Sequence, residues 1–184
     1  MTPDPPRGLP TLREVTEQAA QIQLVIFDVD GVLTDGRLYL GNDGNEYKAF
    51  HSRDGHGIKM LLDAGIEVAL ISGRHAASVE RRAADLGIRH AYLGVPDKRV
   101  AFETLLAQLG LNAAQVAFVG DDLIDLPVMN RVGLAIAVQD ADGFVKQHAH
   151  WHTASRGGRG AAREVCELLL AARGQLASQR KRYC

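Results

Sequence analysis

The sequence predicts an α/β fold, a Rossmann-like parallel sheet with helices on both faces and a projecting β-hairpin. Two observations carry this prediction. Short apolar runs alternate with helical patterns along most of the chain, joined by short links, as in sheets built from right-handed strand-helix-strand units. The apolar run 24–27 ends abruptly at Asp28 and Asp30, which is typical of a buried strand that delivers polar groups to the edge of a sheet.

The first fifty residues contain the start of the sheet and the hairpin. Residues 1–21 begin with a proline-rich stretch, so we expect a flexible segment that contains one short helix over 12–20. The strand 24–27 follows. Residues 37–40 and 46–50 flank the turn sequence Gly41-Asn42-Asp43-Gly44-Asn45, and these turn residues tolerate positive φ. We therefore predict a β-hairpin over about 36–50.

The remaining elements alternate regularly, as a parallel sheet requires. Helices are expected over 57–64, 76–86, 98–109, 126–131 and 161–172, and strands over 67–71, 91–93, 116–119 and 134–138. No low-complexity linker marks a second domain, so one domain is expected over 22–173. Residues 174–184 contain Arg180-Lys181-Arg182 and are expected to be a flexible basic tail.

Composition narrows the possible partners. The 184 residues are 46% hydrophobic and 23% charged, with a formal net charge of -1, so no overall basic field favours nucleic acid or anionic membranes. The sequence has no apolar run long enough to cross a bilayer, and a cytoplasmic location is expected. Cys166 lies in an apolar helical pattern while Cys184 is the last residue, so we expect no structural disulfide and a buried Cys166.

Reactive side chains follow three of the expected strands. Asp28 and Asp30 follow the first, Ser72 and Arg74 the second, and Asp121 and Asp122 a later one, while Lys98 begins a helix. Neighbouring carboxylates repel each other unless a cation lies between them, and magnesium prefers carboxylate and phosphate oxygens. The residues present therefore suit one magnesium ion and one phosphate group.

In this order the motifs resemble those of the haloacid dehalogenase superfamily of phosphatases. The resemblance covers roughly residues 24–140 and rests on four segments: Asp28-x-Asp30-Gly31-x-Leu33-Thr34, Ser72, Lys98, and Gly120-Asp121-Asp122-x-x-Asp125. It implies that Asp28 is the nucleophile that forms an aspartyl-phosphate. It also implies that Asp30 first protonates the leaving oxygen and then activates water.

The same resemblance assigns the other parts of the site. Ser72 and Lys98 join the two acids as catalytic residues, and magnesium is held by Asp28, the backbone carbonyl of Asp30, and Asp121. Asp122 and Asp125 are expected in supporting positions, with a structural helix-start acid an equal alternative for Asp125. The short spacings from Asp28 to Ser72 and from Lys98 to Asp121 leave no room for a cap domain.

Three further segments resemble the branch of the superfamily that dephosphorylates an eight-carbon keto-sugar acid in lipopolysaccharide synthesis: 51–58, 72–74 and 157–166. This branch implies a homotetramer formed through the hairpin, and a C-terminal segment that covers a neighbour's site through Gly157, Gly158, Arg159 and Gly160. The implied contacts to the sugar-acid phosphate are His51, Ser52, Arg53, Asp54, Gly55, Lys59, Arg74, Arg82 and Lys98. Lys59 is a departure, because the family can have Arg there.

Several alternatives stay open at this point. The substrate could be the 9-phosphate of a nine-carbon sialic-type acid or a phosphoprotein, and the chain could be a non-catalytic interaction subunit, although such a subunit needs neither Asp28 nor Asp30. Arg53, Arg74 and Arg82 could belong to ordinary solvated surfaces. His148, His150 and His152 alternate as zinc or nickel ligands on a strand would, but no carboxylate or cysteine accompanies them, and ordinary surface histidines are the simpler interpretation.

Overall fold

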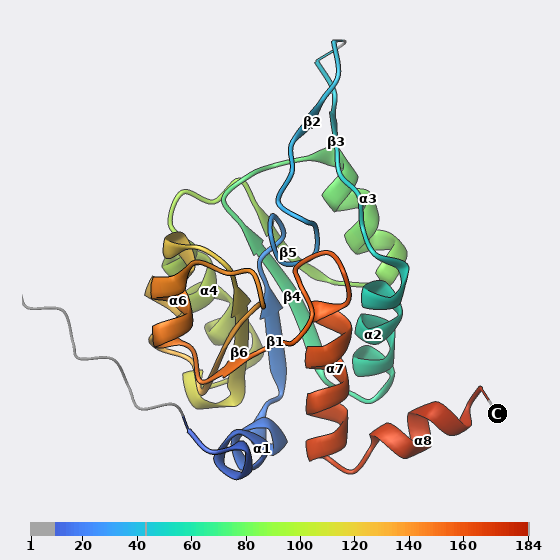
Figure 1. Ribbon diagram of the computed structural model, residues 1–184, viewed down its shortest axis with the longest axis vertical. Coiled ribbons are helices and arrows are strands. Elements are labelled where there is room, and N and C mark those ends of the chain that lie inside the picture. Colours follow the sequence, from blue (N-terminus) through green and yellow to red (C-terminus); the bar gives the residue numbers. More distant parts are fainter. Residues whose placement is uncertain (1–9, 43, 184) are drawn as a thin grey trace, which may run out of the picture.

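The computed structural model describes residues 10–42 and 44–183, in which a six-stranded parallel sheet forms the centre (Figure 1). Expectations for residues 1–9, for Asp43 in the hairpin turn and for Cys184 lie outside the described residues. The strand order is β5-β4-β1-β6-β7-β8. The strands are β1 (Leu24–Phe27), β4 (Glu67–Ser72), β5 (His90–Leu93), β6 (Val116–Gly120), β7 (Leu134–Ala137) and β8 (Trp151–His152).

The strand β1 is central, and its sequence explains why. All four of its side chains are buried, as expected for a parallel strand that is covered on both faces. It pairs with β4 on one side and β6 on the other, with Phe27 opposite Leu70 and Val119. The carboxyl ends of these three strands therefore meet at one edge, which confirms the predicted α/β architecture.

Helices cover the sheet in two layers (Figure 1). Right-handed crossovers place the helices that precede β4 and β5 on one face, and those that connect β5 to β6, β7 and β8 on the other. The first layer contains α1 (Leu12–Gln21), α2 (Ser52–Asp63), α3 (Ala77–Leu86) and α7 (Ala161–Ala172). The second contains α4 (Lys98–Leu109), α5 (Leu126–Met129) and α6 (Gly143–His148).

The domain extends further toward both ends than the expected 22–173. A capping box between Thr11 and Glu14 starts α1, and its Val15 and Ala19 are buried while α1 packs against α7. At the other end, α8 (Leu176–Lys181) lies within the segment that was expected to be a flexible tail. Arg182, which directly follows α8, forms an ion pair with Asp63 of α2 at 2.5 Å.

The short elements α6 and β8 were also not predicted from the sequence. His148 ends α6 and His152 lies in β8, so the three histidines do not alternate along one strand. His148 and His152 contact the backbone oxygens of Phe144 and Lys146, and His150 accepts a hydrogen bond from the Ala135 N–H at 2.9 Å. These contacts support the simpler interpretation, and the metal-like spacing does not correspond to a cluster. The helix α2 also begins five residues earlier than expected.

The predicted hairpin is present as the short strands β2 (Tyr39–Leu40) and β3 (Glu46–Tyr47). Figure 1 shows that it projects from the carboxyl end of the sheet. Its large apolar side chains are exposed in the single chain, and Leu40 is 72% accessible. Two 3-10 turns complete the described elements, Ala113–Gln115 and Leu123–Asp125. None of the described helices is long and apolar enough to cross a membrane.

Candidate active site

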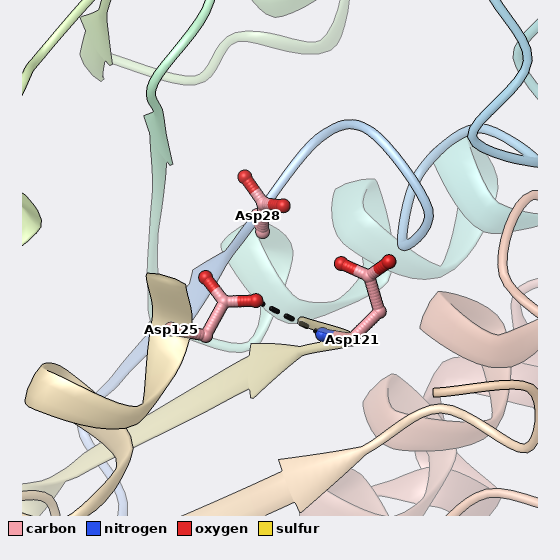
Figure 2. Close-up of side chains that lie close together, drawn as sticks. All are labelled: Asp28, Asp121 and Asp125. Atoms are coloured by element: carbon pink, nitrogen blue, oxygen red, sulfur yellow. Dashed lines mark hydrogen bonds between the residues drawn. The ribbon is translucent and has the colours of Figure 1, made fainter. Parts of the chain in front are cut away.

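Three carboxylates meet at the carboxyl end of the central strands (Figure 2). Asp28 directly follows β1, Asp121 directly follows β6, and Asp125 ends the 3-10 turn after it. One oxygen from each of the three lies within 4.8 Å of the others. Asp28 and Asp125 are buried and Asp121 is partly buried. Such a group of oxygen donors could hold a hard divalent cation.

A buried lysine completes this group. Lys98, the first residue of α4, forms ion pairs of 2.7 Å with Asp28 Oδ1 and with Asp125 Oδ1, and its side chain is 4% exposed. The other oxygen of Asp125 accepts hydrogen bonds from the backbone N–H groups of Asp121 and Asp122. Asp125 therefore contacts both the lysine and the loop that carries Asp121.

The electrostatics show that the cluster has an excess of negative charge. Burial and the nearby Asp125 raise the pKa of Asp28 to about 7, although the ion pair with Lys98 opposes this shift. Burial, together with Asp28 and Asp125, raises the pKa of Asp121 to about 8. Burial alone would lower the pKa of Lys98, but the two carboxylates outweigh it and raise this pKa. One lysine does not balance three acids, and a cation at Asp28 and Asp121 would.

Asp121 provides the structural test of whether a metal fits this site. Its Oδ1 is buried and has no hydrogen-bond partner, which is costly for a carboxylate unless a ligand is bound. Gly31 makes room for this carboxylate, because its φ is +90° and a Cβ there would overlap the Asp121 side chain. The residues present therefore suit a divalent cation at Asp28 and Asp121.

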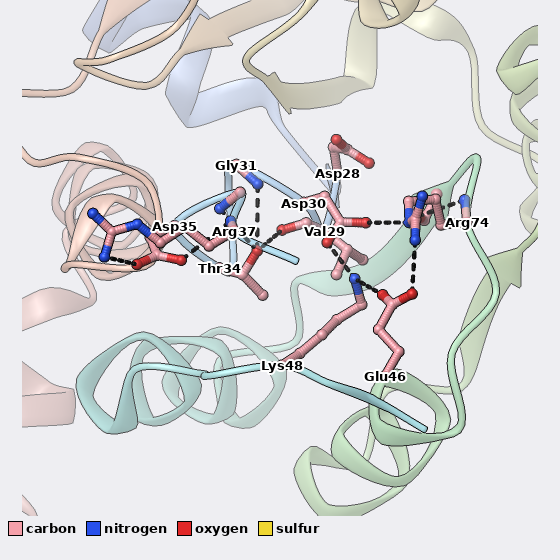
Figure 3. Close-up of polar contacts among 12 residues, drawn as sticks. Asp28, Val29, Asp30, Gly31, Thr34, Asp35, Arg37, Glu46, Lys48 and Arg74 are labelled. Carbon is pink, nitrogen blue, oxygen red and sulfur yellow. Dashed lines mark hydrogen bonds and ion pairs between the residues drawn. The ribbon is translucent and has the colours of Figure 1, made fainter. Parts of the chain in front are cut away.

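Asp30 lies beside the acid cluster and has its own charged partners, Lys48 of the hairpin stem and Arg74 after β4 (Figure 3). Lys48 forms an ion pair with Asp30 Oδ1 and another of 2.7 Å with Glu46. Glu46 is bound in turn by Arg74 at 2.7 Å, and hydrogen bonds from Lys48 and Arg74 lower the pKa of Glu46. Sequence reasoning missed Lys48 and Glu46, because no local pattern shows that the hairpin stem folds back onto Asp30.

A cavity of about 280 Å³ opens between these groups. Asp28, Asp30, Ser72, Arg74 and Asp121 all line it. Ser72 is buried, and its hydroxyl accepts a hydrogen bond of 3.2 Å from the Arg74 N–H. Asp122 also lines the cavity, and its carboxylate accepts a hydrogen bond from the Leu123 N–H. The structure thus brings together the predicted catalytic and metal-binding residues.

The predicted substrate contacts are more dispersed. Arg53 lines a separate hollow of about 330 Å³ with Arg159 and Arg163 at the start of α7. Lys59 is exposed on α2, as is Ser52, while His51 precedes that helix. Arg82 lies over the Phe50 ring at 5.9 Å. None of these lines the cavity around Asp28 within the single chain.

Asp54 and Gly55 have structural partners in their own chain. Asp54 is buried, and its carboxylate accepts hydrogen bonds from the Gly160 N–H at 3.2 Å and the Arg163 N–H at 2.8 Å. Burial raises the pKa of Asp54, against the effect of these hydrogen bonds. A Cβ at Gly55 would overlap the Arg82 guanidinium. The structure therefore places Asp54 as a cap for the first turn of α7 and not in the cavity.

The glycine-rich loop, which was expected to cover a neighbouring subunit's site, packs against its own chain. Gly157 donates to Asp140 at 2.9 Å and Gly158 donates to the Val32 carbonyl at 2.8 Å. A Cβ at either glycine would overlap the backbone of residues 31–35. The backbone of Gly157, Gly158 and Gly160 is therefore anchored to its own chain, and the lid over a neighbouring subunit's site stays a prediction for these residues. Arg159 is exposed and forms an ion pair of 3.5 Å with Asp35.

Comparison with known proteins agrees with the geometry. Residues 94–165 match the family of haloacid dehalogenase-like hydrolases. The chain is 52% identical over 167 residues to the 3-deoxy-D-manno-octulosonate 8-phosphate phosphatase KdsC of Yersinia pestis, a match that covers 91% of this chain and 89% of the relative. It is 53% identical to the KdsC of Escherichia coli strain K12, with the same coverage.

Solved structures give the same result. The phosphatase of the same name from Yersinia pestis aligns with a TM-score of 0.88 at 52% identity over 89% of each chain. The Moraxella catarrhalis phosphatase, solved with magnesium ion, phosphate ion and 3-deoxy-D-manno-octulosonate (KDO), aligns with a TM-score of 0.93 at 37% identity, over 95% of this chain and all of that chain. A cobalt-bound relative from Haemophilus influenzae aligns with a TM-score of 0.85 at 43% identity, over 89% of this chain and 99% of that chain.

Proposed function

Because the chain belongs to the 3-deoxy-D-manno-octulosonate 8-phosphate phosphatase family of haloacid dehalogenase-like hydrolases, we propose that it hydrolyses that phosphate ester to the free sugar acid and phosphate. The chain is a phosphatase, as predicted. The observation that carries the substrate proposal is the cluster of Asp28, Asp121, Asp125 and Lys98 in a chain that is 52% identical to KdsC.

The first chemical step is assigned to Asp28. Its carboxylate attacks phosphorus, a bond forms between them, and the bond from phosphorus to the sugar oxygen breaks. Lys98 holds Asp28 Oδ1 at 2.7 Å, which fixes the carboxylate as it approaches the phosphate. The N–H groups at the strand ends and the Ser72 hydroxyl can bind the phosphate oxygens. Asp30 lines the same cavity and gives a proton to the leaving oxygen.

The second step returns the site to its starting state. Asp30, now deprotonated, takes a proton from water, and the oxygen of that water attacks phosphorus as the bond to Asp28 breaks. We propose Mg²⁺ as the cofactor, held by Asp28, the Asp30 carbonyl and Asp121, where it would neutralise the phosphate charge that otherwise repels Asp28. The buried Asp121 Oδ1 without a partner supports this assignment.

The substrate and the assembly belong to the same proposal. No cap domain is inserted in the described chain, so the cavity stays open unless another subunit covers it. The exposed Leu38, Tyr39, Leu40 and Tyr47 on the hairpin support a homotetramer formed through this hairpin. Arg74 lines the cavity and can bind the sugar carboxylate with a planar guanidinium. We place the enzyme in the cytoplasm, in lipopolysaccharide synthesis.

A comparison of substrates tests the proposal. Purified enzyme should hydrolyse 3-deoxy-D-manno-octulosonate 8-phosphate faster than the 9-phosphate of a nine-carbon sialic-type acid, and only with Mg²⁺ present. The measurement is released phosphate, expressed as kcat/KM for both compounds. Faster turnover of the nine-carbon compound would replace the substrate assignment. Equal and slow turnover of both would leave only the reaction type.

A further inference from the structure

Lys48 occupies a position that the chemistry above does not use. Its side chain comes from the stem of the hairpin, directly after β3, and it is 1% exposed. Its two partners are carboxylates, Asp30 and Glu46. Lysine is almost never fully buried unless it is paired, and here the charge of Lys48 is directed at the side chain that exchanges the proton.

The two carboxylate oxygens of Asp30 have different surroundings. Lys48 binds Oδ1, whereas Oδ2 is buried without a hydrogen-bond partner, and Arg74 Nε lies 3.9 Å from it. Asp30 lines the cavity and Lys48 does not. The lysine therefore acts on the reaction only through Asp30, and it leaves one carboxylate oxygen free to give and take the proton.

Glu46 fixes the lysine from the other side. Its Oε1 lies 2.7 Å from Lys48 and its Oε2 lies 2.7 Å from Arg74 Nη2. Carboxylates and cations thus alternate in the order Asp30, Lys48, Glu46 and Arg74. Neither cation can move away without leaving a carboxylate unpaired. A misplacement of about 1 Å can cost roughly 10²-fold in rate, and a general acid or base must lie within hydrogen-bond reach of the proton.

We propose that Lys48 is a positioning residue that holds the carboxylate of Asp30 for proton exchange, with Glu46 as its anchor. This inference rests on the proposed function for the role of Asp30, and it adds two residues of the hairpin to the reaction. Tyr47, between them in sequence, is 57% exposed. The hairpin segment 46–48 therefore exposes Tyr47 to solvent and also carries the two residues, Glu46 and Lys48, that hold Asp30.

The test separates the two chemical steps with p-nitrophenyl phosphate. Its leaving group is a stable anion that departs without a proton, so the first step needs no acid, whereas the second still needs Asp30 as the base. In Lys48→Met, steady-state turnover should fall by roughly 10- to 100-fold. This loss is smaller than the whole contribution of a general base, because Asp30 is still present but is no longer held in place. The first turnover should change by less than about threefold, so stopped-flow should show a burst of nitrophenolate close to one equivalent.

Three variants complete the design. Lys48→Arg keeps the charge and should recover most of the activity, and Arg89→Met removes an exposed cation paired with Glu67 and should behave as wild type. If Lys48→Met fails to fold by circular dichroism, Lys48→Gln replaces it. Unchanged turnover, or equal loss in the first and later turnovers with the fold and assembly intact, would overturn the proposal. Failure of the substrate assignment would appear separately, in the wild-type comparison of sugar phosphates.

Discussion

Replacing Asp121 by asparagine should stabilise the protein without metal while it removes the response to magnesium. In the metal-free protein Asp121 is a partly buried acid near two other carboxylates, and its pKa is raised from 3.8 to about 8. The unfolded chain loses this proton near pH 4, whereas the folded chain keeps it up to about pH 8. The free energy of unfolding must therefore fall as the pH rises through this window.

The size of the effect follows from the shift. A change of about four pKa units corresponds to roughly 5 kcal/mol of destabilisation at pH 8, since one unit is worth about 1.4 kcal/mol. The side-chain amide in the Asp121→Asn variant would also lack hydrogen-bond partners, because Oδ1 of Asp121 has none. This loss offsets part of the stability gained by removing the charge. We expect Asp121→Asn to be about 2 to 3 kcal/mol more stable than wild type at pH 8, and equal or less stable at pH 4.

Urea unfolding at pH 4, 6 and 8 in EDTA measures this difference, and repetition at pH 8 with Mg²⁺ completes the design. Magnesium should stabilise the wild type, because a ligand of the folded state raises its unfolding free energy, and it should have little effect on the variant. Parallel pH profiles for the two proteins would refute the electrostatic reasoning. A full magnesium response in Asp121→Asn would refute the metal assignment.

Three further substitutions test other parts of the structure. Lys98→Met should cost about 3 to 5 kcal/mol at pH 8, because Asp28 and Asp125 are left without their buried cation; a loss in urea unfolding that does not shrink at pH 5 would contradict this cause. Gly158→Ala should destabilise more than Gly174→Ala, since both have positive φ but only Gly158 meets backbone atoms of residues 34 and 35; equal melting temperatures would count against the docked loop. Leu40→Lys, at a side chain that is 72% exposed in the single chain, should lower the molar mass in analytical ultracentrifugation with unchanged circular dichroism, and an unchanged mass would exclude this part of the hairpin as the subunit contact.

The parts of the fold that could be predicted from the sequence are those whose cause is local. The apolar run at residues 24–27 is buried on both faces, and the described turn residues 41, 42, 44 and 45 lie between the two strands of a hairpin. Asp28 follows β1, Asp121 follows β6 and Lys98 begins α4. These side chains meet because the parallel strands end at one edge of the sheet. The cluster of Asp28, Asp121 and Lys98 was therefore predictable.

The parts that were missed depend on contacts between distant segments. The short helix α6 and the two-residue strand β8 are too brief to leave a periodic pattern. The role of Asp54 depends on α7, more than a hundred residues later. Lys48 and Glu46 look like ordinary hairpin charges until the stem folds back onto Asp30. The reactive residues at the strand ends could be predicted from local sequence, but the residues that position them come from distant segments and could not.

The most direct measurement of the central claim is to locate the phosphoryl group on the enzyme during turnover. Acid quench within milliseconds of mixing with substrate and Mg²⁺, reduction of the acyl phosphate with borohydride, and tandem mass spectrometry identify the modified residue. The account predicts that Asp28 alone is modified and that Asp28→Asn gives neither modification nor phosphate release. Modification of Asp30, or phosphate release by Asp28→Asn, would contradict it.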